Sequence, residues 1–551
     1  MDQARLVIAI ALSFLVFFLW NIFFIDKETV QKPGQDLQEK KLVKEEQYEK
    51  TFDKQITDTT ILDKDDSSQH LIKPRTVTVK SPLYSVQISE IGAVFNSFVL
   101  KKYREKVEKD SPLKELLSGN SKTGTLLTKF AANSLPGLDN ALFKADTEFD
   151  FIDVFNTPKD ISFSWISPNG VIIEKKYFFT PETYMIGLNI TIKNGSNQTI
   201  EDNLILSLIN NSPEQKSTYG FEGPSTLLNN KLEKVKIKKI KDKNEYTGKL
   251  RWIAIQDRYF MSSIMPKNYQ EASMRLFINQ DDILEAQYMQ SESVINPGTQ
   301  HAFEFELFFG PKSMKILSKS DYDLDKAINF GMFDFIAKPC VWIMNFIYGF
   351  IPNYGVAIIL LTLLTKILLW PLGTKSYKSM GEMKKIQPLM AEIREKYKSD
   401  KKRMNQEVMG LYKTYKINPM GGCLPMVAQI PVFFALYRML YEAIELRHAP
   451  FFGWINDLSA PDRLFHFNFS IPFMQPPYGI PILTLIMGAS MLLQQKMSPP
   501  PGDPAQAKMM MFMPIIFTFI FINFSSGLVL YWLTNNLLSI SQQYYISKKK
   551  A

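Results

Sequence analysis

Val356-Ala-Ile-Ile-Leu-Leu-Thr-Leu-Leu-Thr-Lys-Ile-Leu-Leu-Trp370 is an apolar stretch that carries a single charge, Lys366. A charged side chain at membrane depth costs roughly 2.5–3.5 kcal/mol on insertion scales, so it needs water, a partner or a route to the surface. Thr362 lies one helical turn before Lys366, which gives the stretch a polar stripe on one side. Two interpretations stay open: the lysine stem reaches the headgroups, or its ammonium lies in a hydrated functional cavity.

The chain of 551 residues contains six apolar runs close to the roughly 20 residues that a helix needs to cross a bilayer. They cover 6–25, 355–372, 424–441, 479–497, 508–524 and 527–545. No small-residue cleavage site follows the first run, so residues 1–25 are interpreted as an uncleaved membrane anchor. The sequence therefore predicts a polytopic α-helical membrane protein with six spans.

Basic residues predict the orientation of these spans. Segment 373–418 carries ten lysines and two arginines against five acids, a net charge of +7, whereas segment 442–478 has a net charge of −2. Short loops rich in Lys and Arg stay in the cytoplasm. We therefore expect 373–418 inside and 442–478 outside, with both termini cytoplasmic and the long segment after the first run external.

Between the first two apolar runs the sequence changes character. Residues 26–70 are rich in charged and polar residues and predict a flexible tether. Residues 71–320 alternate between apolar and polar side chains, which predicts antiparallel strands of one large all-β domain, a β-sandwich with an aromatic core. The clearest runs are Thr76–Lys80, Tyr84–Ile88, Val171–Phe179, Ile186–Ile192 and Phe303–Phe309. Residues 321–353 predict an interfacial helix on the outer leaflet.

Residues 375–417 predict a cytoplasmic helical hairpin. Its apolar residues form two seams with coiled-coil-like spacing on either side of Ser399-Asp400. The seams are Met383, Ile386, Met390, Ile393 and Tyr397, and then Met404, Val408, Leu411 and Tyr415. Pro388 predicts a bend in the first helix. The basic side chains of the hairpin either meet ribosomal RNA or anionic lipid, or form a solvated face. They include Lys384, Lys385, Arg394, Lys401, Lys402 and Arg403.

No pattern in the sequence indicates catalysis, a cofactor or a metal site. The four histidines lie outside the apolar runs and lack metal-ligand spacing, and no glycine-rich nucleotide loop is present. Two alternatives stay open: an intramembrane serine protease with Ser490 activated by Lys366, and a secondary transporter whose intramembrane charge binds a small solute. Cys340 and Cys423 are expected on opposite sides of the membrane, too far apart for a disulfide.

Several motifs carry a family likeness. In chain order they are Asn418-Pro-Met-Gly-Gly-Cys-Leu-Pro-Met-Val-Ala-Gln-Ile-Pro-Val-Phe433, Glu445-Leu-Arg-His-Ala-Pro450, Trp454-Ile-Asn-Asp-Leu-Ser459, Gln495-Lys-Met-Ser-Pro499, Phe512-Met-Pro514 and Ser526-Gly-Leu-Val-Leu-Tyr-Trp532. Together with the N-terminal anchor and the large external β domain, they resemble the YidC/Oxa/Alb family of membrane protein insertases in its Gram-negative form. The likeness covers essentially the whole chain.

The resemblance implies an insertase core at 354–551, with five helices around a hydrophilic groove that is closed toward the periplasm, and a β-supersandwich as the periplasmic domain. The central charge of the family is usually arginine. The matching residue here is Lys366, which keeps the charge and lacks the planar fork of five donors. The groove residues expected are Lys366, Thr362, Gln429, Thr534 and Asn535. The residues expected to contact a substrate helix are Ile430, Phe433, Ile520, Phe524, Tyr531 and Trp532. Two alternatives stay open: the first four are ordinary lipid-facing side chains, and Tyr531 and Trp532 either close the groove on its outer side or form an aromatic belt.

The resemblance also implies the partners and the location. Expected partners are nascent membrane proteins, the SecYEG translocon with SecDF, the ribosome, the signal recognition particle receptor and membrane lipids, and neither DNA nor a cofactor is expected. The location implied is the bacterial inner membrane. A groove that reaches part-way across the bilayer shortens the low-dielectric slab, and a cation within it attracts acidic tails of substrates. The implied function is insertion and folding of membrane proteins, alone or beside the Sec translocon.

Overall fold

The computed structural model of the chain describes residues 75–117, 124–213, 220–415, 417, 424–498 and 504–550. All of them belong to one compact unit, 74–551. The predicted anchor and tether lie outside the described residues, as does Cys423. Cys340 is a buried free thiol. Because Cys423 is not described, the predicted separation of the two cysteines stays a prediction.

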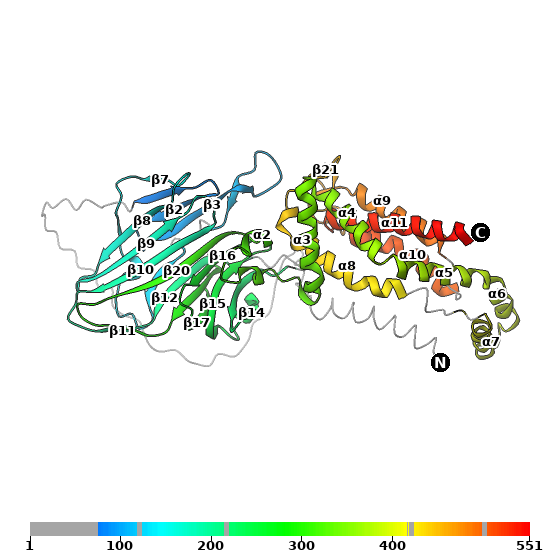
Figure 1. Cartoon of the computed structure of the whole chain (residues 1–551), viewed down its shortest axis with the longest axis horizontal. Helices are drawn as coiled ribbons and strands as arrows, with labels where there is room; N and C mark the ends of the chain where they lie inside the picture. Colours follow the sequence, from blue (N-terminus) through cyan, green and yellow to red (C-terminus); the bar gives the residue numbers. More distant parts are fainter. Residues whose placement is uncertain are drawn as a thin grey trace, which may run out of the picture. The chain divides into compact units, whose positions relative to one another are not determined.

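The β domain contains two large sheets (Figure 1). The five-stranded sheet has the order β4 (Leu113–Glu115), β3 (Val94–Arg104), β2 (Tyr84–Ser89), β1 (Thr76–Lys80) and β7 (Phe151–Asp153). The main path of the larger sheet is β5 (Leu127–Phe130), β12 (Leu204–Asn211), β18 (Ile283–Gln290), β17 (Glu271–Ile278), β15 (Glu245–Gln256), β16 (Phe260–Pro266), β20 (Gln300–Pro311), β10 (Met185–Asn194), β9 (Val171–Phe179), β8 (Lys159–Ile166) and β6 (Lys144–Ala145). Strands β13 (Gly223–Leu228) and β14 (Lys231–Lys234) branch from β15, and β11 (Ile200–Asp202) pairs with β19 (Ser293–Ile295).

The alternating runs are confirmed as strands. Thr76–Lys80 and Val171–Phe179 match β1 and β9 from end to end, and in β9 buried side chains alternate with half-buried or exposed ones. The turn at Pro168-Asn169-Gly170 joins β8 to β9, with Gly170 at φ 83° in the left-handed region that glycine favours. Aromatic side chains form the core, as predicted: ring centroids are 4.7 Å apart for Tyr84 and Phe98.

A fully buried lysine, Lys175, lies inside this core. Lys175 is 0 % exposed, because the alternation of β9 points it inward between Ile173 and Tyr177. Its Nζ donates to the carbonyls of Gly92 at 3.0 Å and Leu126 at 2.8 Å. Burial lowers the pKa of Lys175 to about 7. The side chain therefore ties β9 to two backbone segments and loses much of its charge at neutral pH.

The helices follow the β domain. After the short α2 (Met314–Leu317) they are α3 (Asp334–Phe350), α4 (Tyr354–Leu368), α5 (Trp370–Lys385), α6 (Gln387–Lys396), α7 (Lys401–Thr414), α8 (Leu424–Glu442), α9 (Ile482–Met497), α10 (Pro504–Phe521) and α11 (Ser526–Lys550). Within the described ranges, no single helix is both long and apolar enough to cross a membrane by itself. Helices α4 and α5 together are long and apolar enough, but the pair is bent by 66°. The bend falls inside the predicted run 355–372, where Pro371 occupies the first turn of α5.

Helix α3 is amphipathic, and it lies within the segment 321–353 predicted to be helical. Its inward face buries Ala337, Cys340, Val341 and Met344. Its outward face exposes four aromatic side chains, Phe335, Trp342, Phe346 and Phe350. A row of exposed aromatics is typical of a helix at a membrane interface. The interfacial position itself stays a prediction.

The hairpin prediction is confirmed for its helices and corrected for part of its seam, since the cluster of buried side chains does not include the predicted Met383, Tyr397 and Met404. The first helix breaks at Ile386, so α5 and α6 are separate helices with Pro388 in the first turn of α6. Helices α6 and α7 lie side by side (Figure 1). The buried seam contains Ile386, Met390 and Val408. Tyr415 is 51 % exposed, because the following chain brings Ile417 onto the seam instead.

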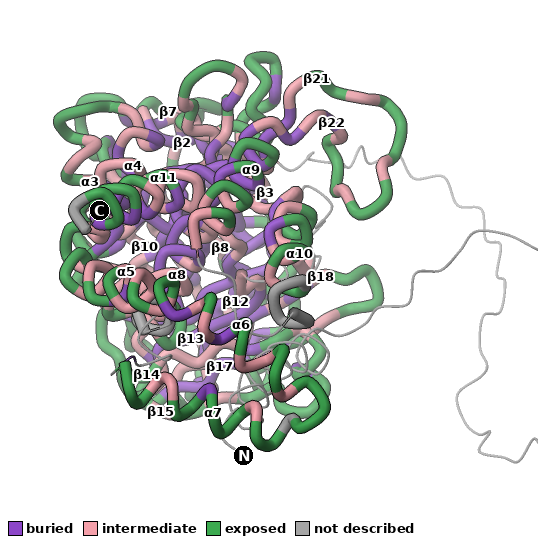
Figure 2. The backbone as a smooth tube through the Cα atoms, turned by 90° about the vertical axis from the view of Figure 1, so that its right-hand side faces the viewer, coloured by how far each residue is buried: buried purple, intermediate pink, exposed green. Residues whose placement is uncertain are grey.

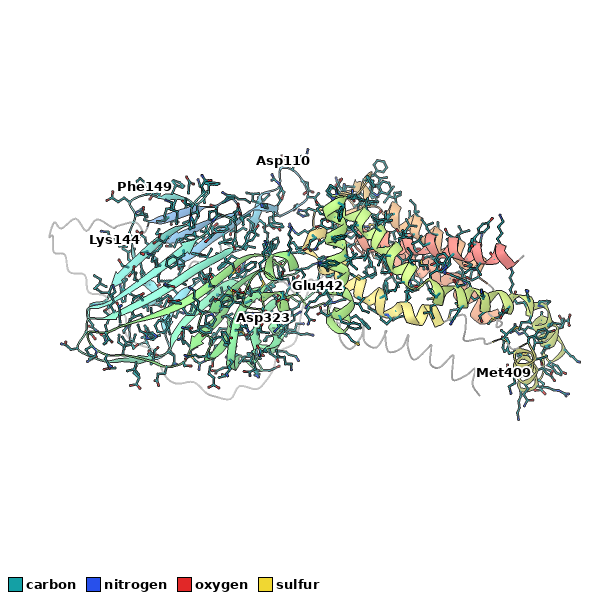
Figure 3. All side chains as sticks on the ribbon, in the orientation of Figure 1. Asp110, Lys144, Phe149, Asp323, Met409 and Glu442 are labelled. Carbon is teal, nitrogen blue, oxygen red and sulfur yellow. The ribbon has the colours of Figure 1, made fainter. Side chains whose placement is uncertain are left out.

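The β domain contacts the segment at the end of α8. Arg258, between β15 and β16, donates from Nε to the carbonyl of Tyr441 at 2.7 Å, and its guanidinium lies 3.6 Å from the centre of the Tyr441 ring. Arg447 donates to the carbonyl of Arg104, at the end of β3, at 2.6 Å. Figure 3 marks Glu442, the last residue of α8, at this junction. The loop after α8 therefore lies on the same side of the helices as the β domain.

Candidate functional site

Helix α11 supplies most of the polar side chains buried among the helices. It packs against α4, α5, α8 and α9, and Figure 1 shows α4, α9 and α11 running side by side. Its polar residues recur at the spacing of one helical face. They are Asn535, Asn536, Ser539, Gln542 and Gln543, and all except the half-buried Asn535 are buried. We call this row the polar seam of α11.

Lys366 joins this seam. Its half-buried side chain crosses from α4 to α11, where Nζ donates to the Ser539 hydroxyl at 2.6 Å. The same hydroxyl donates to the carbonyl of Asn535 at 2.7 Å. Within the part of the chain that the structure describes, Lys366 forms no salt bridge. Its charge is held by a neutral partner and is available to attract an anion.

Gln429 of α8 is the second predicted groove residue that reaches the seam. Its Nε2 donates to Asn535 Oδ1 at 2.9 Å, and its side chain also hydrogen-bonds Tyr531. The hydroxyls of Thr362 and Thr534 instead donate to carbonyls one turn back on their own helices, at 2.6 and 2.8 Å. Lys366 and Gln429 are therefore both connected to Asn535 of α11 by hydrogen bonds, Lys366 by way of Ser539. The hydroxyls of Thr362 and Thr534 hydrogen-bond within their own helices, α4 and α11.

The seam includes residues that sequence reasoning missed as groove residues. Asn536 Nδ2 donates to Ser490 Oγ of α9 at 3.1 Å. Gln542 and Gln543 donate to the carbonyls of Trp370 and Met497, at 3.1 and 2.9 Å. Ser490, considered above as a nucleophile, donates to its own Met487 carbonyl. The spacing that continues from Asn535 to Ser539 and Gln542 was a signal that could have identified them.

The predicted substrate-contact residues fall into two groups. Ile430 on α8 and Ile520 on α10 are 43 % and 50 % exposed. Phe433, Phe524 and Trp532 are half-buried and belong to one aromatic cluster, in which the Phe433 and Trp532 ring centroids are 4.7 Å apart. Tyr531 is only 3 % exposed. Apolar surface is therefore exposed at the two isoleucines, and we call these two residues together with the aromatic cluster the apolar flank.

Most of the predicted basic residues of the hairpin whose side chains the structure describes are exposed. Lys384, Lys385, Lys402 and Arg403 are exposed and Arg394 is half-buried, while the side chain of Lys401 lies outside the described residues. Figure 2 shows that the backbone of α7 is mostly exposed, in contrast to the buried strands. The hairpin lies at the end of the helices away from the β domain (Figure 1), and its surface is basic and accessible.

Comparison with known proteins gives matches along the chain. Residues 76–343 match the family model described as the YidC periplasmic domain, and residues 346–551 match the 60Kd inner membrane protein family. A protein named membrane protein insertase YidC from Syntrophobacter fumaroxidans is 39% identical over 99% of this chain and 100% of its own length. One of the same name from Syntrophus aciditrophicus is 42% identical over 87% of this chain and 86% of its own. A crystal structure titled as an active YidC insertase, with 19% identity and a TM-score of 0.38, covers 86% of this chain and 93% of that one.

Proposed function

Because the chain belongs to the YidC family of membrane protein insertases, we propose that Lys366 and the polar seam of α11 form the groove through which it acts. The protein is an insertase of the inner membrane, and nascent membrane proteins are its substrates. The observation that carries the groove proposal is the contact between Lys366 and Ser539, which holds a cation among buried polar groups with no counter-ion from the described residues.

The groove acts by electrostatics and by shortening the barrier. A hydrophilic tail of a substrate must cross a low-dielectric layer, where each unsolvated charge is expensive. The half-buried side chains of Gln429 and Asn535 give this tail hydrogen-bonding partners beside Lys366. Lys366 attracts acidic residues in the tail, and the membrane potential adds about 2.3 kcal/mol per charge per 100 mV.

The apolar helix of the substrate leaves along the flank. Ile430 and Ile520 present exposed apolar surface on α8 and α10, and the aromatic cluster around Phe433 and Trp532 supports it. Transfer of the substrate helix out of water and into lipid, by way of this flank, supplies the driving force, at roughly 25 cal/mol for each Å² of apolar surface removed from water. No nucleotide is needed for this step.

We propose the six-span topology with both termini in the cytoplasm. In this arrangement 1–25 is the anchor, 26–70 the tether, 71–320 the periplasmic β domain, 321–353 the interfacial helix and 354–551 the insertase core. The charge difference between segments 373–418 and 442–478 supports it. The contact of Arg447 with Arg104 also supports it, because it groups the loop after α8 with the β domain.

Water access at position 366 distinguishes a hydrated groove from a lysine that reaches the headgroups. In a chain with Cys340→Ser and Cys423→Ser, Lys366→Cys is expected to react with a membrane-impermeant maleimide added from the cytoplasmic side. Leu364→Cys is the matched control on α4, since Leu364 is exposed on the apolar surface of the helix and is expected to face lipid. Equal, slow labelling of both positions would contradict the hydrated groove.

The basic hairpin is proposed to recruit the ribosome or the signal recognition particle receptor, and the groove is proposed to act alone or beside SecYEG and SecDF. Deleting 380–412 is expected to weaken ribosome binding several-fold, because the exposed cations of α5 and α7 attract RNA phosphates. Replacing Lys384, Lys385, Lys402 and Arg403 by Gln should reproduce the effect without removing the helices. The measurement is co-sedimentation of the purified chain with ribosomes at two salt concentrations.

The control for the hairpin variants replaces four exposed lysines of the β domain by Gln: Lys144, Lys159, Lys236 and Lys239. These changes alter the net charge equally and should leave ribosome binding unchanged. If the hairpin and control variants bind ribosomes equally well, the hairpin does not recruit the ribosome through its charge.

A further inference from the structure

The loop that follows α8 lies beside the start of α9, the end of α10 and the start of α11. Its segment 457–463 forms hydrogen bonds with all three of these helix ends. At the start of α11, the Ser526 amide donates to the carbonyl of Ala460 at 2.8 Å and the Gly527 amide donates to the carbonyl of Leu458 at 2.9 Å. The Ser526 hydroxyl donates to the carbonyl of Asp457 at 2.7 Å. Two amides of the first turn of α11, which have no partner within the helix, are therefore satisfied by this loop.

Asp462 satisfies the start of α9. Its carboxylate accepts the amide of Leu483 at 2.8 Å and the hydroxyl of Thr484 at 3.0 Å. Helix α9 begins at Ile482, so both groups belong to its first turn. The N-terminus of a helix carries partial positive charge and favours a carboxylate. Asp462 is buried, which strengthens this interaction relative to one in water.

Arg463, the next residue, satisfies the end of α10. Its Nη1 donates to the carbonyl of Ile522 at 2.8 Å, directly after the last residue of α10, Phe521. Its Nε donates to the carbonyl of Pro477 at 2.9 Å. The C-terminus of a helix carries partial negative charge and favours a cation. Arg463 is buried as well, and its planar fork is what allows it to reach separate carbonyls at once.

We propose that Asp462 and Arg463 form an outer latch, which fixes the outer ends of α9, α10 and α11 against one another and closes the groove on the periplasmic side. Two adjacent residues of opposite charge meet two helix ends of opposite polarity, and the same loop segment holds the third helix. Removing either side chain leaves buried helix-end groups without partners. The claim that the latch closes the groove rests on the proposed function. The claim that it fixes the three helix ends together rests on these contacts alone.

Water access from the periplasmic side tests the latch. Val529 is buried in α11, one turn beyond Ser526, and serves as the reporter position Val529→Cys in a chain with Cys340→Ser and Cys423→Ser. With the latch intact, an impermeant maleimide added to the periplasmic side is expected to label the reporter slowly. Arg463→Ala or Asp462→Ala is expected to speed this labelling about tenfold, because buried polar groups left unpaired favour opening of the helix ends.

The matched control removes a cation elsewhere on the outer side. Lys338→Ala breaks the 3.0 Å ion pair with Asp334 on α3, leaves the hydrogen bonds of Asp462 and Arg463 in place, and is expected to leave labelling unchanged. Labelling of the same reporter from the cytoplasmic side should also be unchanged in the latch variants, whereas general loosening of the fold would raise it from both sides.

Conservative variants keep the test decisive if the alanine variants fail to fold. Arg463→Lys keeps the charge without the fork, and Asp462→Asn keeps one acceptor without the charge, so each should label at an intermediate rate. Folded conservative variants that label as slowly as the intact chain would overturn the latch. Insertion activity of the reporter chain with the latch intact is measured in parallel. Its absence, together with faster labelling in the variants, would reject the proposed groove function and leave the latch standing.

Discussion

Lys366→Glu is expected to reduce the insertion of a single-span substrate with an acidic tail by at least about tenfold. Unit charges about 5 Å apart at an effective dielectric of about 20 interact by roughly 3 kcal/mol, and each 1.4 kcal/mol is a factor of ten. The substitution converts attraction into repulsion beside the Ser539 hydroxyl, which cannot neutralise a carboxylate. The measurement is the protease-protected fraction of the substrate in vesicles that contain each variant.

Two comparisons separate charge from shape in this experiment. Lys366→Arg keeps the cation and should retain most of the activity, with a fork that also suits carboxylates. A substrate with the same apolar helix and an uncharged tail should be affected much less by Lys366→Glu. Equal activity of the Glu and Arg variants on the acidic-tailed substrate would remove the electrostatic role of Lys366.

The stability of the β domain is expected to increase with pH between 7 and 10.5 because of Lys175. The folded pKa of Lys175 is about 7 and its ordinary value is 10.5, so in this window the unfolded chain binds more protons than the folded chain, and raising the pH favours folding. Between pH 7 and pH 9 the contribution is about 2 kcal/mol. Below pH 7 both states are protonated and the contribution stays constant.

Lys175→Met isolates this term. The variant loses the hydrogen bonds to Gly92 and Leu126 at every pH, but it also loses the titrating group. Its free energy of unfolding relative to the original chain should therefore fall by about 2 kcal/mol from pH 7 to pH 9. Urea unfolding monitored at both pH values provides the comparison. A pH-independent difference would show that Lys175 titrates at its ordinary pKa in the folded protein.

Much of the fold follows from local patterns. Alternation identifies β1 and β9 residue by residue, and Pro388 places the break between α5 and α6, because both effects act within a few residues of the chain. The same alternation places Lys175 on the inward face of β9, and its charge is the reason that sequence reasoning did not assign it to the core. The end of the hairpin seam was predicted wrongly at Tyr415, since the coiled-coil spacing continues beyond the point where the chain leaves the helix.

The arrangement of the candidate site depends on contacts between distant parts of the chain. Lys366 was identified because a charge in an apolar stretch is visible in the sequence, but its partner Ser539 lies 173 residues away. Asp462 and Arg463 read in the sequence as two loop charges, and only the packing of α9 and α10 shows what they bind. The sequence around a side chain does not show that it will hydrogen-bond the backbone groups at the end of a distant helix.

The central claim is that this chain inserts a hydrophilic tail through a groove that depends on Lys366. Its most direct test uses liposomes that contain only the purified chain and a short single-span substrate with an acidic tail. We expect the intact chain to give protease-protected substrate above the level of empty liposomes, and Lys366→Ala to lose most of that protection. Protection that survives Lys366→Ala in full would contradict the role of Lys366, and its absence with the intact chain would contradict autonomous insertion.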